Sequence, residues 1–448
     1  MSMARASVVL VLCLLAAPPA SHAQAPPPAT PVMERVLGRA LSLEEAVAIA
    51  LETQPQIQAR LYDYMAAAHR VDQAFAPLLP QLTGSWTAAR TQSASASDRT
   101  IFGEATGRRV TSTTIRPFNE ATEARITLSQ VLFDFGKTFA STEAARRLAE
   151  VAQEDVELQR QLITLTVKES FININFARRL ILVQEQAVER ANLNLRSARG
   201  FFEVGTRPKS DVARAEVDVA NARLDLIRAR NAERLARVAL NTAMGIAADT
   251  PTEVQDILVY QPMTIDRAQL LGQALAQRPE YKQARLSVSE AEARARRAFR
   301  DFFPDISAAG SYGGARADFN EIWELRLELQ WSIFDGGNRL SRFRETKALI
   351  DAAQARVKAT ELDISREVEQ AQLNVGEAQE RIAAAQTAVA SAQENFRLAQ
   401  GRFDAGVGTI LELTDAQLFL TQAQNTEAQA LADYRIALAR LERAIGRR

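Results

Sequence analysis

The pattern of apolar and polar residues changes from a helical period to a strand period, and it does so twice along the chain. Apolar residues recur at helical spacing over 43–76 and over 265–299, and each stretch closes at a proline-containing turn. Strict alternation follows, and it is clearest from Trp323 to Ile333. We therefore expect two strand hairpins, with strands at about 81–91 and 122–133 in the first and at about 305–316 and 321–333 in the second.

Two long segments without proline follow the strand pairs. They cover 137–204 and 338–405, and the shorter segments 210–243 and 411–444 come after them. At 1.5 Å per residue, roughly 66 residues make about 100 Å of helix, about the length of two shorter helices placed end to end. We therefore expect each long helix to pack against two shorter, stacked ones.

The first long segment has two apolar stripes rather than one. One passes through Leu158 and Phe176 and the other through Ile163 and Ile174, about 140° apart around the helix. A helix with two buried flanks belongs in a curved wall of helices. The alternative is a helix of an ordinary bundle, which normally needs only one wider stripe.

An internal repeat organises both halves of the chain. Phe133-Asp134-Phe135-Gly136 corresponds to Phe334-Asp335-Gly336-Gly337 at an offset of 201 residues, whereas Pro80 and Pro304 correspond at an offset of 224. The 23 extra residues place an enlarged loop at 91–119. We expect a first unit at 24–246, a connector at 247–263 and a second unit at 264–448.

The first 23 residues have the features of an export signal. Arg5 supplies a positive charge, residues 8–17 form an apolar run, and Ser21-His22-Ala23 is a small-x-small cleavage site. Cys13 follows the bulky Leu12, whereas a lipoprotein signal has a small residue at that position. We therefore expect residues 1–23 to be removed by cleavage after Ala23, without lipidation. The alternative, an uncleaved membrane anchor, would need about 20 apolar residues, roughly twice the length of this run.

The composition leaves little material for catalysis. The 448 residues carry 54 basic and 54 acidic side chains, so no net charge attracts the protein to nucleic acid. After signal cleavage no cysteine and one histidine, His69 in a helical stretch, remain. Unless His69 acts alone, a Ser-His-Asp triad, a Cys-His pair, a zinc site and a disulfide framework lack their side chains. We expect neither an enzyme nor a bound metal or cofactor.

All three tryptophans, Trp86, Trp323 and Trp331, fall in the expected strands. The distance from Trp323 to Trp331 along a strand would be about 26 Å, close to the apolar band of an outer-membrane barrel with its aromatic girdle. A half-buried strand of a soluble sheet is the alternative. Four strands cannot close a barrel in lipid, so several copies must contribute; two would give eight strands, and three would give twelve and a clear lumen.

Several motifs occur in a fixed order in both units. They are a helix, the turn represented by Pro77-Leu78-Leu79-Pro80, a strand hairpin, Phe-Asp-x-Gly, a long helix and a turn such as Val204-Gly205-Thr206. In this duplicated combination, nearly the whole mature chain resembles the TolC-like outer-membrane efflux proteins. The resemblance implies a mostly α fold with a small β part: a homotrimer whose twelve-stranded transmembrane β-barrel continues into a long periplasmic α-helical barrel. It also implies the outer membrane of a Gram-negative bacterium, a periplasmic adaptor protein, and an inner-membrane pump or ABC transporter.

The same resemblance implies roles for the ends of the long helices. The gate acids of the family fall on Glu412 and Asp415, which share one helical face and would form two carboxylate rings in a trimer. Alternatively, Glu412 only favours a helix N-terminus. Asp211 is the equivalent of Glu412 in the first unit and fits a helix cap or a contact between tips. The tips that close the tunnel and dock the adaptor correspond to Val204, Gly205, Thr206, Ala405, Gly406 and Val407.

One position departs from the family pattern. The family often has a basic residue two positions after the second tip glycine, where it joins neighbouring hairpins, but this chain has Gly408. Arg207 is the nearest basic side chain in the first unit. We therefore expect the closed state to be held together differently, or more weakly, than in the family.

These features predict a passive outer-membrane channel-tunnel, the exit duct of a tripartite efflux or type I secretion system, which partner proteins open. A soluble periplasmic coiled-coil scaffold or adaptor protein is the alternative function.

Overall fold

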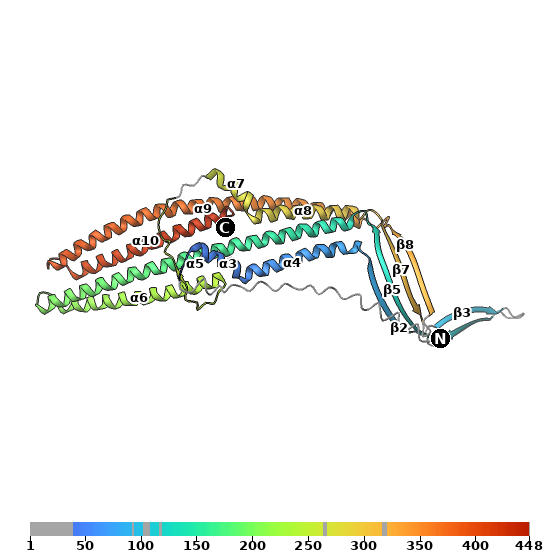
Figure 1. Cartoon of the computed structure of the whole chain (residues 1–448), viewed down its shortest axis with the longest axis horizontal. Helices are drawn as coiled ribbons and strands as arrows, with labels where there is room; N and C mark the ends of the chain where they lie inside the picture. Colours follow the sequence, from blue (N-terminus) through green and yellow to red (C-terminus); the bar gives the residue numbers. More distant parts are fainter. Residues whose placement is uncertain are drawn as a thin grey trace.

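The computed structural model describes residues 39–91, 94–101, 108–115, 119–262, 267–315 and 320–447, and the expected export signal at 1–23 lies outside them. The described part is elongated, with a body of helices at one end and a sheet at the other (Figure 1). None of the described helices combines the length and the apolar content needed to cross a membrane.

Two long helices run the length of the helical body. α5 (Lys137–Glu203) and α9 (Asn338–Asp404) have 67 residues each. A shorter helix returns along each of them, α6 (Lys209–Met244) along α5 and α10 (Ile410–Ala444) along α9 (Figure 1). Toward the sheet, α4 (Pro55–Phe75) packs on α5, so that α4 and α6 together match its length.

The second unit repeats this plan with one helix shared between its neighbours. α8 (Pro279–Arg300) packs on both α5 and α9. The short helices α3 (Leu43–Thr53) and α7 (Arg267–Gln277) precede α4 and α8, and the 3-10 turn η2 (Ala76–Leu78) follows α4.

The expectation of unbroken helices over 43–76 and 265–299 is wrong. Gln54 and Arg278 have extended backbones, with ψ of 116° and 126°, and they separate α3 from α4 and α7 from α8. The ring of a proline disfavours the helical conformation of the residue before it. Pro55 and Pro279 then stand at the first helical position, where a missing N–H leaves no bond unmade.

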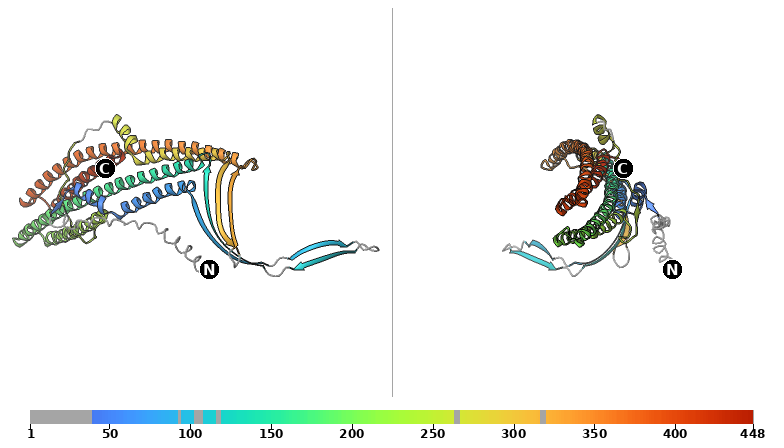
Figure 2. Two further views of the ribbon diagram at one scale, coloured as in Figure 1. Left: turned by 45° about the vertical axis from the view of Figure 1, so that its right-hand side comes forward. Right: turned by 90° about the vertical axis from the view of Figure 1, so that its left-hand side faces the viewer.

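The helices form a curved layer when seen from the end (Figure 2, right). α5 lies inside this layer and contacts α4 and α6 of its own unit as well as α8 and α10 of the other. Ile163, Val167 and Ile174, from one of its stripes, are buried in a core with Leu240 and Met244 of α6. One stripe is therefore buried within its own unit while α5 also contacts the other unit, and the helices form a curved wall rather than an ordinary bundle.

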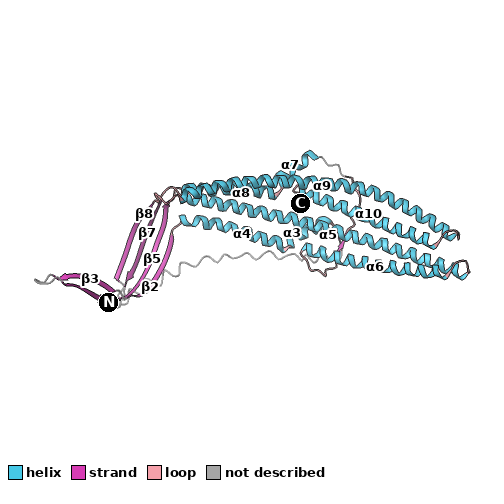
Figure 3. Ribbon diagram, turned by 180° about the vertical axis from the view of Figure 1, so that it is seen from behind, coloured by secondary structure: helices cyan, strands magenta, loops and turns pink. Residues whose placement is uncertain are grey.

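The four expected strands join into one antiparallel sheet. β2 (Gln81–Thr91), β5 (Asn119–Phe133), β7 (Asp305–Ala315) and β8 (Asn320–Gln330) pair in the order β2-β5-β7-β8 (Figure 3). The two hairpins are thus linked through β5 and β7. Each edge strand, β2 and β8, has one partner strand within the described residues.

One face of the sheet is apolar. The register pairs Ile126 with Tyr312 and Tyr312 with Trp323, so residues of successive strands share this face. Its large side chains are exposed: Leu82, Trp86, Ile126, Leu128, Tyr312, Trp323, Leu325, Leu327 and Leu329. No layer formed by the described residues covers this apolar surface.

The opposite face of the sheet carries charges. Arg125 of β5 lies 3.7 Å from Glu324 of β8, and Arg326 lies 2.7 Å from the same carboxylate. This alternation between an apolar and a charged face separates a lipid-compatible side from a water-compatible one.

Two expectations about the strands need correction. The alternation predicts Trp331 inside the last strand, but β8 ends at Gln330, which pairs with Asp305. Pro304, the residue before Asp305, would be the next partner, but it has no N–H to extend the ladder. The Trp331 indole instead donates to the carbonyl of Phe302 at 3.1 Å. The enlarged loop at 91–119 contains a hairpin, β3 (Ala94–Ile101) with β4 (Arg108–Ile115), that extends beyond the sheet (Figure 2, left).

The chain segment that leads from the first unit to the second crosses the middle of the body. β6 (Glu253–Val254) pairs in parallel with β1 (Ala40–Leu41). Arg178 of α5 donates to the carbonyl of Val254 at 2.8 Å, and the Tyr434 hydroxyl of α10 donates to that of Gln261 at 2.6 Å. The segment is therefore fixed to both units.

Candidate gate at the helical tips

Each long helix ends in a left-handed glycine. Gly205 has φ of 74° and Gly406 has φ of 76°, a region that favours glycine. The N–H of Gly205 donates to Phe202 O, and that of Thr206 to Phe201 O, both at 3.0 Å. Gly406 and the residue after it bond in the same way, so both turns satisfy the last helical carbonyls.

The tips leave apolar side chains in solvent. Val204 and Val407 are each 72% exposed. Thr206, Ala405 and the two glycines lie beside them at the extreme end of the body. The six expected tip residues therefore form one exposed surface on each hairpin.

A small aromatic core lies directly behind the tips. Phe403 of α9 is fully buried, and its ring meets that of Phe201 of α5 edge to face, with centroids 5.6 Å apart. Ile410 and Leu413 of α10 are buried in the same cluster. The two hairpins of one chain are thus joined by packing near their ends.

Arg207 adds a polar link between the tips. Its Nη2 donates to the carbonyl of Gly408 in the other hairpin and lies 3.4 Å from the carbonyl of Gly406. The guanidinium also lies over the Phe403 ring, 5.1 Å from its centroid. Asp211 supports it from the first unit, with 3.8 Å between Arg207 Nη1 and Asp211 Oδ2. We call these five residues the tip tether.

The turn around Gly408 leaves little room for a side chain. A Cβ at this position would lie 2.9 Å from the Cβ of Arg402 and 3.0 Å from its carbonyl carbon, so a side chain would force the turn to move. The family often has a basic residue at this position, whereas in this chain Gly408 provides a backbone carbonyl as an acceptor. The base comes from Arg207, which is the equivalent residue of the first unit at the offset of 201.

The two expected gate acids have different surroundings. Both Glu412 and Asp415 are exposed on α10. Glu412 stands in the first turn, where its N–H donates to Thr409 Oγ1 at 3.2 Å, and its carboxylate is 3.6 Å from Arg402 Nε. Within the described residues, no ion pair is seen for Asp415. The helix-start role therefore applies to Glu412, and the structure brings Asp211, but neither gate acid, to Arg207.

Behind the tips, a row of polar contacts joins α5 to α10. Asn194 Nδ2 donates to Gln417 Oε1 at 2.6 Å, and Gln417 Nε2 donates to the carbonyl of Ala187 at 3.2 Å. Arg190 reaches Thr421 Oγ1 at 3.4 Å, and burial lowers its pKa. Sequence reasoning missed this row, although polar residues at helical spacing between apolar stripes were its signal.

The described residues contain no group of three or more side chains that could hold a metal ion. The tips instead offer turns, carboxylates and a guanidinium at one end of a long helical wall.

Known proteins match this chain over most of its length. The family model described as outer membrane efflux protein matches residues 46–246 and 270–447. The alkaline protease secretion protein AprF of Pseudomonas aeruginosa is 25% identical over 429 residues, which cover 90% of this chain and 84% of that protein. The outer membrane efflux protein BepC of Brucella suis is 23% identical over 299 residues, which cover 65% and 60%.

Solved structures have the same fold. The outer-membrane channel OprN matches with a TM-score of 0.73 at 20% identity, over 90% of this chain and 89% of its own. The outer membrane protein VceC of Vibrio cholerae matches with a TM-score of 0.72 at 19% identity, over 90% and 96%.

Proposed function

Because the chain belongs to the outer membrane efflux protein family and forms an outer-membrane exit duct, we propose that three copies close its wall and that the tip tether holds its periplasmic end shut. The soluble scaffold considered from the sequence is not favoured, since the family match extends through both units. The family consists of channels rather than enzymes, and the duct is proposed to act as a passive conduit.

Closure by further copies is required by the open strand edges, and three copies are proposed because twelve strands leave a clear lumen. A strand edge cannot remain open in lipid, and among the described strands β2 and β8 are each paired on one side only. Pairing of β8 with β2 of the next copy would give twelve strands in a homotrimer. The helical flanks support the same neighbour, because α9 exposes Leu362 and Leu373 while α4 and α6 expose Tyr62 and Ile227.

The proposed barrel would place its apolar face and its tryptophans in the membrane. Trp86 and Trp323 lie on this face, and Trp331 lies just beyond it at the helical end of the sheet. The three side chains are therefore proposed as the aromatic girdle, with the charged face lining the lumen.

The proposed partners are a periplasmic adaptor and an inner-membrane pump or ABC transporter. AprF is named for secretion of a protease and BepC for efflux, and such export needs an energy source that a passive duct lacks. The exposed valines at the tips provide the apolar surface that an adaptor would cover.

The main support for a closed periplasmic end is the hydrogen bond from Arg207 to the backbone of the opposite tip. Arg207→Gln trimers in planar lipid bilayers should show an open probability about tenfold to a hundredfold higher, because a charge-assisted hydrogen bond contributes about 1.5–3 kcal/mol. Arg199→Gln is the matched control, since it removes the same charge from an exposed pair with Glu216 nearby. Equal open probabilities for the two variants would remove Arg207 from the gate.

The acidic rings are tested by ion selectivity. Glu412→Ala with Asp415→Ala should weaken the preference for cations, because three copies would otherwise present six carboxylates near the tunnel end. Asp404→Ala removes an exposed carboxylate close to the same tip and serves as the control. An unchanged preference in the double variant would eliminate the gate assignment.

A further inference from the structure

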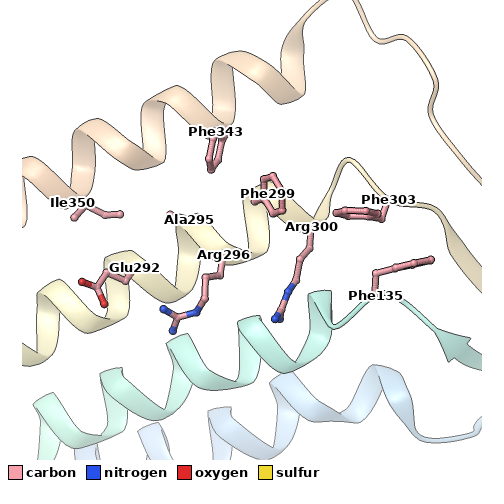
Figure 4. A pocket seen from close by; sticks show the side chains of 9 residues that line it. All are labelled: Phe135, Glu292, Ala295, Arg296, Phe299, Arg300, Phe303, Phe343 and Ile350. Atoms are coloured by element: carbon pink, nitrogen blue, oxygen red, sulfur yellow. The ribbon is translucent and has the colours of Figure 1, made fainter.

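A cavity of about 580 Å³ lies where the sheet meets the helices, between α8 and α9 (Figure 4). All the residues that line it belong to one chain. Aromatic rings and arginines dominate its lining, which consists of Phe135, Glu292, Ala295, Arg296, Phe299, Arg300, Phe303, Phe343 and Ile350.

The cavity is continuous with the apolar face of the sheet. Phe133 pairs with Ile306, which pairs with Leu329 on that face. The Phe133 ring meets Phe135 at 4.7 Å, and Phe135 stacks on Phe303 at 5.3 Å between centroids. An apolar path therefore leads from the membrane side of the sheet into the cavity.

Phe135 occupies a backbone position that suits glycine. Its φ is 53°, the one positive value of a non-glycine residue in the described chain, and its equivalent in the second unit is Gly336 with φ of 69°. A bulky residue in this region is held there by its surroundings. The two ring contacts of Phe135 are what the glycine could not provide.

Two guanidiniums stand beside the rings. Arg296 and Arg300 are one helical turn apart on α8 and extend toward α5 (Figure 4). Arg300 uses one of its five N–H groups, since Nη1 donates to the carbonyl of Gly136 at 2.6 Å. Arg296 forms no ion pair with any described residue, although Glu292 lines the same cavity. The first unit has Asp72 and Ala76 at the equivalent positions, so it lacks this pair.

We propose that this cavity binds an anionic phospholipid of the leaflet that faces the periplasm. The phosphate would accept from Arg296 and Arg300, and the start of one acyl chain would lie along Phe299, Phe303 and Phe135. The helical end of the sheet is the periplasmic one, so the cavity stands at the level of that leaflet's headgroups. The inference rests on the outer-membrane placement of the sheet.

Trp331 provides the measurement, because its indole donates to Phe302, whose ring is 6.3 Å from that of Phe299. A protein with Trp86→Phe and Trp323→Phe keeps Trp331 as its only tryptophan. The trimer is inserted in vesicles of mixed phosphatidylglycerol and phosphatidylcholine, with bromine on the acyl chains of one lipid or the other. We expect brominated phosphatidylglycerol to quench Trp331 more strongly than brominated phosphatidylcholine does. The affinity of the site for phosphatidylglycerol relative to phosphatidylcholine should be about fivefold higher for each arginine that contributes.

Variants on the two sides of α8 locate the site. Arg296→Gln with Arg300→Gln should abolish the preference, and the two lysine replacements should retain most of it. Arg297→Gln with Arg342→Gln is the matched control, because these exposed arginines line a different cavity at the same level. Equal quenching by the two lipids, or a preference that survives the first pair of changes, would overturn the proposal while the membrane placement stands. No quenching by either lipid would instead contradict the membrane placement itself.

Discussion

Gln54 and Arg278 occupy the same point in the two units, each directly before the proline that divides the shorter arm. Gln54 is buried and donates through Nε2 to the carbonyls of Ala243 at 3.0 Å and Thr242 at 3.3 Å. It thereby satisfies the end of α6 with a neutral side chain.

Arg278 instead forms a charged cluster at the equivalent point of the second unit. It is 2% exposed, and it donates to Glu280 at 2.7 Å and to Glu367 at 2.6 Å. Arg443 contacts the same two carboxylates at 2.9 Å and 3.2 Å. Burial raises the pKa of Glu280, but the bonds from Arg278 and the nearby charges outweigh it and hold that pKa below its usual value. The first unit has Gln56, Thr166 and Thr242 at the other three positions, so its junction is neutral throughout.

The difference between the junctions teaches that a duplicated backbone does not fix its side-chain chemistry. Equivalent positions of the two units also carry different side chains at both ends of the molecule. At the tips, Arg207 of the first unit binds the backbone of Gly408, its own equivalent. At the membrane end, Phe135 stands where the second unit has Gly336. In each of these two pairs only one unit supplies the side chain, and its equivalent in the other unit is a glycine.

The largest expected effect separates the two junctions. Arg278→Met should lower the free energy of unfolding by about 3–5 kcal/mol, because two half-buried carboxylates lose their charge-assisted bonds to Arg278 and keep only Arg443 as a partner. Gln54→Met should cost about 1–3 kcal/mol, since only neutral groups lose their bonds. Thermal unfolding of the purified trimer measures both. The exposed Arg285→Met is the control and should change stability by less than about 0.5 kcal/mol. Equal losses at the two junctions would show that charge makes no difference there.

The second prediction concerns the left-handed pair at the membrane end. Gly336→Phe should destabilise the protein by about 1–2 kcal/mol, the cost of a left-handed backbone for a residue with a side chain. A Cβ at Gly336 meets no atom within 4 Å, so strain rather than collision would be measured. Gly336→Asn should cost less, because asparagine tolerates this region better. If the phenylalanine variant unfolds at the temperature of the native protein, the position imposes no demand and Phe135 needs no special explanation.

The smallest effect is a difference in pH dependence. Since the folded pKa of Glu280 is lowered from 4.5, its contribution is complete above about pH 4.5 and is lost as the pH falls through the folded value. The native protein should therefore lose stability below that pH more steeply than a variant with the second junction neutralised, R278Q/E280Q/E367T/R443T. Unfolding temperatures of both proteins between pH 7 and pH 3 test this. Parallel curves would mean that the lowered pKa of Glu280 contributes nothing to stability.

Much of the architecture could be read from periodicity. Alternation around Trp323 predicts a strand, and the lack of proline over 137–204 predicts a long helix, because both signals are local and repeat many times. The breaks at Pro55 and Pro279 were missed because the helical apolar pattern continues on both sides of them. Turn glycines at the tips were readable for a similar reason, since a left-handed residue after a helix has few substitutes.

Contacts between distant segments left no such signal. The carbonyl that receives Arg207 has no side chain to mark it, and Glu367 and Arg443 meet Arg278 only in the folded chain. The roles of Glu412 and Asp415 stay predictions, because they depend on neighbours that one chain does not contain.

The carbonyl of Gly408 that accepts the hydrogen bond from Arg207 does not depend on the side chain, because every amino acid has the same backbone carbonyl. A genetic screen for leaky export would therefore recover changes clustered at codon 207, where the donor is lost. At codon 408 it would recover replacements of any chemical type, since each of them collides with Arg402 rather than removing a bonding group. If the tip tether closes the pore as proposed, closure requires a basic side chain at position 207 and a residue without a side chain at position 408.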